Sequence, residues 1–172
     1  MSIVVPFDGS RLSGAALVRA TQMRAVFGGS ILAVTVIPEE NRQYAREQGW
    51  IGASEAYDIE TIVGRIHQQA VELAPAADYS HALVGRYAQT GIIAKRLREI
   101  AKEADASIVT IGSENAGRIV TGLNSVGGRV TQDDAYDVLI VRTPLPEPVE
   151  ELSELSHSDI GKSDFYIPEK QR

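Results

Sequence analysis

The chain has 172 residues, which is enough for one domain of ordinary size and an additional segment. Its residues are 44% hydrophobic and 23% charged, a composition that excludes a wholly disordered or fibrous chain. The net charge of -6 argues against a protein that coats nucleic acid, because neutralising phosphates requires a basic surface. Because cysteine is absent, disulfides, thiolate metal sites and cysteine nucleophiles are excluded together.

The sequence carries no sign of membrane insertion or export. The first residues, MSIVVPFDGS, lack a basic start followed by a long apolar stretch. No run approaches the ~20 apolar residues that a membrane span requires. We therefore expect a soluble, cytoplasmic protein with neither a membrane nor a nucleic acid as its partner.

The first part of the chain predicts two buried strands with a helix between them. The β-branched run Ser2–Pro6 predicts a strand. Apolar side chains then recur at three- and four-residue steps over residues 16–27, and the pair Gly28-Gly29 predicts the end of a helix. Residues 30–37 predict the next strand.

A charged segment separates this unit from a second helix. Residues 39–53 have no regular pattern, and we expect an irregular segment there that holds the only tryptophan, Trp50. An apolar stripe at helical spacing follows over residues 59–73. It predicts a long helix that is capped by Ser54 and ends before Pro75.

The next elements continue the alternation of strand and helix. Residues 81–87 predict a third strand, which is more polar than the others and is therefore expected near an edge of the sheet. Residues 93–104 carry the apolar stripe of a third helix, and residues 107–111 predict a fourth strand.

After the fourth strand we expect a loop from Gly112 to Asn124, a short helix that begins at Ser125, and a last strand from Val138 to Val141. Strands and helices thus alternate along the whole domain. This order predicts a doubly wound, Rossmann-like α/β fold, in which helices cover both faces of a parallel sheet.

We place the end of the domain near Arg142, so that residues 1–143 form the α/β domain and residues 144–172 an extension. The extension begins with several prolines, and its residues 145–172 carry seven acidic side chains against three basic ones. This composition is typical of a solvated, extended segment. Its only concentrated apolar patch, Phe165, Tyr166 and Ile167, is a candidate contact for a protein partner.

Most catalytic patterns are absent from the sequence. It has no G-x-x-x-x-G-K-[ST], G-x-G-x-x-G or G-x-S-x-G motif, and its three histidines are isolated, without the spacing of metal ligands. No nucleophile is paired with a base. We therefore expect neither an enzyme nor a metal site.

Two segments remain as candidates for ligand binding. Asp8 follows the first strand, where a carboxylate at the carboxyl end can accept a hydrogen bond from a ribose hydroxyl or an adenine amine. The alternative is that Asp8 and Ser10 only cap the helix that follows. The loop after Gly112 exposes backbone N–H groups, and Ser125 begins a helix, so this segment suits a phosphate unless it is an ordinary connection.

The segments VPFDGS, LAVTV, SIVTIGSENAG, NSVGGRV and VLIVR occur in an order and at spacings that resemble the universal stress protein family. The resemblance covers residues 2–142. It implies a five-stranded parallel sheet in the order 3-2-1-4-5 and a homodimer that is paired through the last strand, Val138 to Val141.

The resemblance also implies a site for ATP or a related adenine nucleotide in a regulatory protein. The residues that match the family's site are Asp8, Val36, Gly112, Asn115, Asn124 and Ser125. Asn115 and Asn124 stand where the family pattern has glycines, which leaves open a stress-response interaction protein that binds no nucleotide. A third alternative, an ATP pyrophosphatase-like transferase, requires a Ser-Gly-Gly-x-Asp loop that PFDGS does not match.

Overall fold

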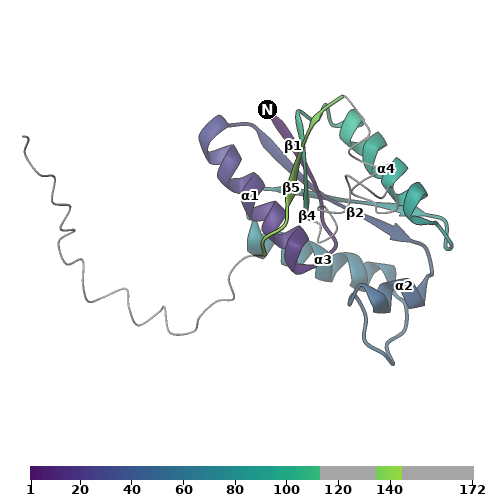
Figure 1. Ribbon diagram of the computed structural model, residues 1–172. Coiled ribbons are helices and arrows are strands. Elements are labelled where there is room, and N and C mark those ends of the chain that lie inside the picture. Colours follow the sequence, from purple (N-terminus) through teal and green to yellow (C-terminus); the bar gives the residue numbers. More distant parts are fainter. Residues whose placement is uncertain (113–134, 145–172) are drawn as a thin grey trace, which may run out of the picture.

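The computed structural model describes residues 1–112 and 135–144 of the chain (Figure 1). The predicted loop and helix at residues 113–134 and the extension beyond residue 144 lie outside the described residues. The described elements are, in chain order, β1 (Ser2–Pro6), α1 (Arg11–Phe27), β2 (Ser30–Pro38), α2 (Arg42–Glu47), α3 (Ile59–Leu73), β3 (Asp78–Val84), α4 (Thr90–Glu103), β4 (Ile108–Gly112) and β5 (Asp137–Val141).

The five strands form one parallel sheet in the order β3-β2-β1-β4-β5, which confirms the predicted fold and strand order. β1 lies at the centre, where Ile3 is opposite Ile31 of β2 and Ile108 of β4. Because all strands run in the same direction, the carboxyl ends of β1, β2 and β4 lie at one edge of the sheet. In a doubly wound sheet this edge, where the strand order reverses, is where ligands bind.

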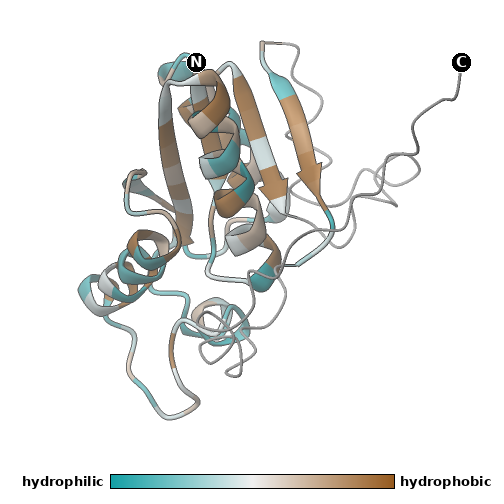
Figure 2. Ribbon diagram, turned by 90° about the vertical axis from the view of Figure 1, so that its left-hand side faces the viewer, coloured by the Kyte–Doolittle hydropathy of each residue, from teal (hydrophilic) through white to brown (hydrophobic). Residues whose placement is uncertain are grey.

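Helices cover both faces of the sheet, so each face has its own core. Figure 1 shows α1 and α4 on opposite sides of the strands. Ile3 and Val5 of β1 point toward the α1 and α3 side, where they pack with Leu17, whereas Val4 points toward α4 and packs with Leu97. The strands are accordingly apolar along most of their length (brown in Figure 2), as expected for strands that are buried on both faces.

Local signals set the ends of α1 as the sequence predicts. At the start, the Ser10 side chain accepts a hydrogen bond from the Ser13 N–H at 3.2 Å. At the end, Gly28 has a φ of 73°, a left-handed conformation that a glycine adopts without strain, and its N–H donates to the Arg24 carbonyl.

Three element boundaries differ from the prediction. The segment expected to be irregular contains the six-residue helix α2, which begins at the capping side chain of Asn41. Asp58, and not Ser54, caps α3, because its carboxylate accepts a hydrogen bond from the Thr61 N–H. The third strand begins at Asp78, three residues before the predicted start, although its predicted place at an edge of the sheet is correct.

None of the helices within the described ranges combines the length and the apolar character needed to cross a bilayer.

Candidate functional site

A cavity of about 190 Å³ opens at the carboxyl ends of β1, β2 and β4. One part of its lining is apolar and comes from the sheet and α4. The other part is polar and aromatic and comes from the segments that follow β1 and β2. The lining residues are Pro6, Phe7, Asp8, Ser13, Val34, Thr35, Val36, Tyr44, Trp50, Ile93, Leu97, Ile111 and Gly112.

Asp8 stands where β1 ends and α1 is about to begin. The Phe7 N–H still donates to the Val34 carbonyl at 2.8 Å, so the ladder between β1 and β2 extends to the residue before Asp8. The half-buried Asp8 carboxylate accepts a hydrogen bond from the Ser10 N–H at 2.9 Å through Oδ1. Asp8 therefore shapes the turn into α1, as the capping alternative expects, and also lines the cavity.

Two aromatic residues form a wall of the cavity beside Asp8. The indole Nε1 of Trp50 donates to the Asp8 carbonyl oxygen at 2.7 Å. The rings of Trp50 and Tyr44 meet edge to face, with 5.6 Å between their centres. Burial raises the pKa of the Tyr44 hydroxyl, and the negative charges of Asp8 and Glu47 raise it further.

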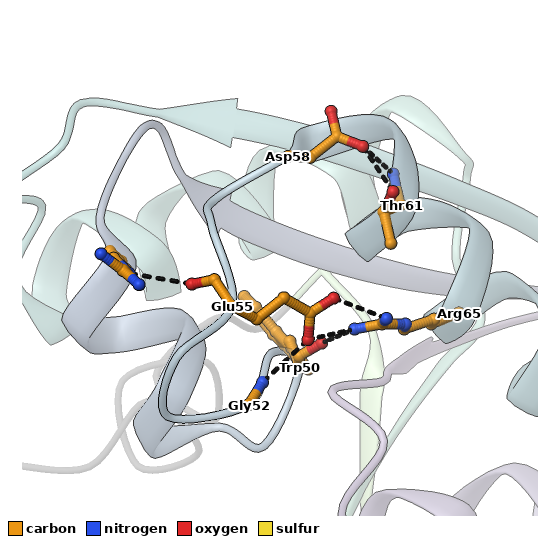
Figure 3. A network of polar contacts seen from close by, with 7 residues as sticks. Trp50, Gly52, Glu55, Asp58, Thr61 and Arg65 are labelled. Carbon is orange, nitrogen blue, oxygen red and sulfur yellow. Dashed lines mark hydrogen bonds and ion pairs between the residues drawn. The ribbon is translucent and has the colours of Figure 1, made fainter.

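An ion pair holds the segment that carries Trp50 (Figure 3). Arg65 of α3 donates two hydrogen bonds to the Glu55 carboxylate, at 2.6 and 3.0 Å, and a third to the Trp50 carbonyl at 3.1 Å. The Gly52 N–H donates to the same carboxylate. These hydrogen bonds lower the pKa of Glu55 to about 2, and the bond from Arg65 has the largest effect.

On the α3 side of the sheet, two hydroxyls brace the backbone at the end of β1. The buried Thr35 hydroxyl donates to the Phe7 carbonyl at 2.6 Å, and the Tyr79 hydroxyl donates to Thr35 Oγ1 at 3.2 Å. The backbone just before Asp8 is thus fixed by β2 and β3, and Asp8 projects from a rigid support.

Gly112 ends β4 where the first turn of α1 comes closest. A Cβ atom at this position would lie 2.0 Å from the Leu12 carbonyl oxygen and 2.6 Å from the Ser13 nitrogen. The chain therefore needs a glycine here for the approach of α1 to β4, whether or not a ligand is bound.

The structure brings three of the six predicted site residues together, because Asp8, Val36 and Gly112 all line the cavity. The other three, Asn115, Asn124 and Ser125, lie outside the described residues. The sequence analysis missed Tyr44 and Trp50 as cavity residues. The only signal for them was the presence of two large aromatic side chains in a segment without a regular pattern.

The cavity combines an apolar surface with a few polar groups, as small-molecule sites commonly do. Val34, Ile93 and Leu97 offer a surface for a flat apolar group, and Asp8 offers a hydrogen-bond acceptor at the rim. Within the described ranges, no three side chains are arranged to hold a metal ion.

Comparison with known proteins gives the relationships of the chain. The model of the Universal stress protein family matches residues 1–142. No curated protein sequence matches the chain.

Several solved structures share the fold. A universal stress protein in complex with cAMP has 25% sequence identity and a TM-score of 0.53, with 82% of this chain and 95% of that one covered. The hypothetical protein MJ0577 has 18% identity and a TM-score of 0.56, with 84% and 97% covered. The universal stress protein from Archaeoglobus fulgidus in complex with dAMP has 17% identity and a TM-score of 0.50, with 81% and 94% covered.

Proposed function

The chain belongs to the universal stress protein family, and from this membership we propose that it is a regulatory protein that binds an adenine nucleotide, ATP or a relative of ATP, in the cavity beside Asp8. Binding stabilises one state of the protein, and partner proteins recognise that state. The proposed role is regulatory and not catalytic, and its proposed place is the cytoplasm.

The observation that carries this proposal is the cavity itself. It lies at the carboxyl edge of the sheet, at the point where the strand order reverses, and it places a carboxylate next to an apolar surface. The apolar surface suits a base and the carboxylate suits a hydroxyl or an amine. Two relatives in the same fold are named as complexes with cAMP and dAMP, which supports an adenine nucleotide as the ligand.

The second candidate is an interaction protein of the same family that binds no nucleotide. Its support comes from Asn115 and Asn124, which stand where the family's nucleotide-binding pattern has glycines. A side chain at such a position occupies space that a glycine leaves to a phosphate. In this case the extension, with Phe165, Tyr166 and Ile167, supplies the contact to a partner.

A thermal unfolding experiment separates the two candidates. ATP, ADP, AMP and cAMP are added to the full chain at increasing concentration. A ligand at 100 times its Kd adds about 2.7 kcal/mol of stability, and each kcal/mol raises the Tm of a chain of this size by about 2–4 °C. We expect a concentration-dependent rise in Tm with at least one of the four nucleotides.

The matched variants are Asp8→Asn and Asp78→Asn. Asp8→Asn keeps an oxygen that accepts from the Ser10 N–H but removes the charge that the proposal assigns to the ligand. It should abolish most of the ligand-dependent shift. Asp78 is exposed at the start of β3, away from the cavity, so Asp78→Asn should leave the shift intact. If no nucleotide moves the Tm and none co-purifies by mass spectrometry, the second candidate stands.

A further inference from the structure

The hydroxyl of Tyr44 differs from those of two other partly buried tyrosines, Tyr57 and Tyr79. The hydroxyl of Tyr79 donates to Thr35, and that of Tyr57 donates to the Pro38 carbonyl at 3.3 Å. Within the described residues, the Tyr44 hydroxyl makes no hydrogen bond, although Tyr44 is half-buried and lines the cavity. A ligand that enters the cavity can therefore bond to this hydroxyl without displacing a hydrogen bond within the described residues.

Tyr44 is also firmly placed. Its N–H donates to Asn41 Oδ1 at 2.9 Å, and Asn41 Nδ2 donates to the Arg86 carbonyl at 2.7 Å, which joins the start of α2 to the segment after β3. Its ring packs against Trp50 and against both cores of the sheet. The position of the hydroxyl is therefore built into the fold.

Asp8 and Tyr44 are complementary in hydrogen bonding and are linked through Trp50, which contacts both. An ionised carboxylate only accepts hydrogen bonds, whereas a phenol hydroxyl also donates. Asp8 Oδ1 already accepts from Ser10, and Oδ2 has no partner in the described ranges. One carboxylate oxygen and one phenol hydroxyl thus remain for a ligand, and two neighbouring hydroxyl groups can bond to both of them.

We propose that Tyr44 is a specificity-determining residue that, together with Asp8, binds the vicinal 2′ and 3′ hydroxyls of a ribose, so that the protein prefers ribonucleotides to their deoxy analogues. This inference rests on the proposed function. Asp8 accepts from one hydroxyl of the ribose, and the Tyr44 hydroxyl bonds to the other. Trp50, which bonds to the Asp8 backbone carbonyl and packs against the Tyr44 ring, holds both residues at this wall of the cavity.

Isothermal titration of the full chain with ATP, 2′-deoxy-ATP and 3′-deoxy-ATP tests this inference. The variant is Tyr44→Phe, which removes only the hydroxyl and leaves the ring contact with Trp50. The control is Tyr87→Phe, which removes the same group from a side chain that is 82% exposed and does not line the cavity.

We expect Tyr44→Phe to weaken the binding of ATP about five- to tenfold, the effect of one hydrogen bond. One of the two deoxy analogues lacks the hydroxyl that Tyr44 contacts and cannot form this hydrogen bond. Tyr44→Phe should therefore weaken the binding of that analogue by less than twofold. Tyr87→Phe should change none of the three affinities.

Each other outcome refutes the inference in a distinct way. If Tyr44→Phe weakens all three ligands equally, Tyr44 only supports the shape of the site. If it weakens none, the hydroxyl does not touch the ligand, while nucleotide binding itself stands. If the natural protein binds none of the three nucleotides, the proposed function and this inference fail together.

Discussion

Gly112 shows how one added Cβ atom would affect the packing beside the site. Since an added Cβ would meet the backbone of Leu12 and Ser13, and backbone in the first turn of a helix cannot move aside alone, Gly112→Ala must push α1 away from β4. We expect the free energy of unfolding to fall by about 3 kcal/mol, the upper range for overpacking. Chemical denaturation followed by circular dichroism measures this loss.

The control for this prediction is another glycine in a different setting. Gly64 lies in the middle of α3, and a Cβ there would meet nothing within 4 Å. Gly64→Ala should therefore stabilise the protein by about 0.5–1 kcal/mol, because alanine loses less backbone entropy in a helix. If Gly112→Ala and Gly64→Ala change the free energy of unfolding equally, α1 does not approach β4 closely at Gly112.

Single residues also show what the sequence can predict about a site. The carboxyl-edge rule for parallel sheets indicated Asp8 and the segment that begins at Gly112, and the family resemblance added Val36; all three line one cavity. The carboxyl-edge rule does not predict the positions of Tyr44 and Trp50, because they come from a segment without a hydrophobic period. Their positions depend on tertiary contacts such as the bond from Arg65 to the Trp50 carbonyl, which no local pattern indicates.

The same distinction holds for whole elements. β1, β2 and β5 were predicted nearly to the residue, because each is a β-branched apolar run with buried positions. α2 was missed, because a six-residue helix with one buried residue, Ala45, leaves no apolar stripe. β3 was displaced because an edge strand alternates polar and apolar residues only weakly, and its pairing with β2 sets where it begins.

The connection between the Trp50 segment and α3 predicts a specific response to acid. The pKa of Glu55 is lowered from 4.5 to about 2 in the folded protein, so folding favours the ionised carboxylate. The resulting stabilisation is fully present above about pH 4.5 and is lost as the pH falls toward 2. We expect the natural protein to be more stable than Glu55→Gln at pH 7, and this advantage to shrink across that window.

Urea unfolding at several pH values between 7 and 2 measures the difference. Because Glu55 and Arg65 are both partly exposed, the difference should also fall as salt is added. Glu39→Gln is the control, since the exposed Glu39 side chain makes no ion pair in the described part of the chain. A difference between the natural protein and Glu55→Gln that is constant from pH 7 to 2 would contradict the assignment.

At the scale of the whole molecule, β5 forms one edge of the sheet and pairs only with β4 among the described strands. Its outer side offers backbone groups, and Leu139 is 37% exposed. Proteins commonly cover such an edge. We therefore propose that two copies pair through the run from Val138 to Val141, as the family resemblance implies.

Ile140→Pro tests the pairing without breaking the sheet. The Asp137 N–H donates to the Ser107 carbonyl, so the N–H groups of alternate residues, Leu139 and Val141, point toward β4, whereas that of Ile140 points outward. Proline is tolerated where the lost N–H faces away from the ladder. Sedimentation should show a dimer for the natural protein and a folded monomer for Ile140→Pro.

Leu139→Pro is the matched control, because it removes an N–H that points toward β4. It should destabilise the fold, which circular dichroism and thermal unfolding detect. If Ile140→Pro remains a dimer, the two copies meet elsewhere on the surface.

The wall beside Asp8 has a practical consequence. Trp50 is the only tryptophan among 172 residues, its side chain is 5% exposed, and its indole N–H is bound to the backbone of the predicted ligand-binding residue. The natural protein therefore has a single indole, located in the cavity that is proposed to take the ligand. Its emission can report on occupation of that one place in the unmodified protein, with no label and no other indole to obscure the signal.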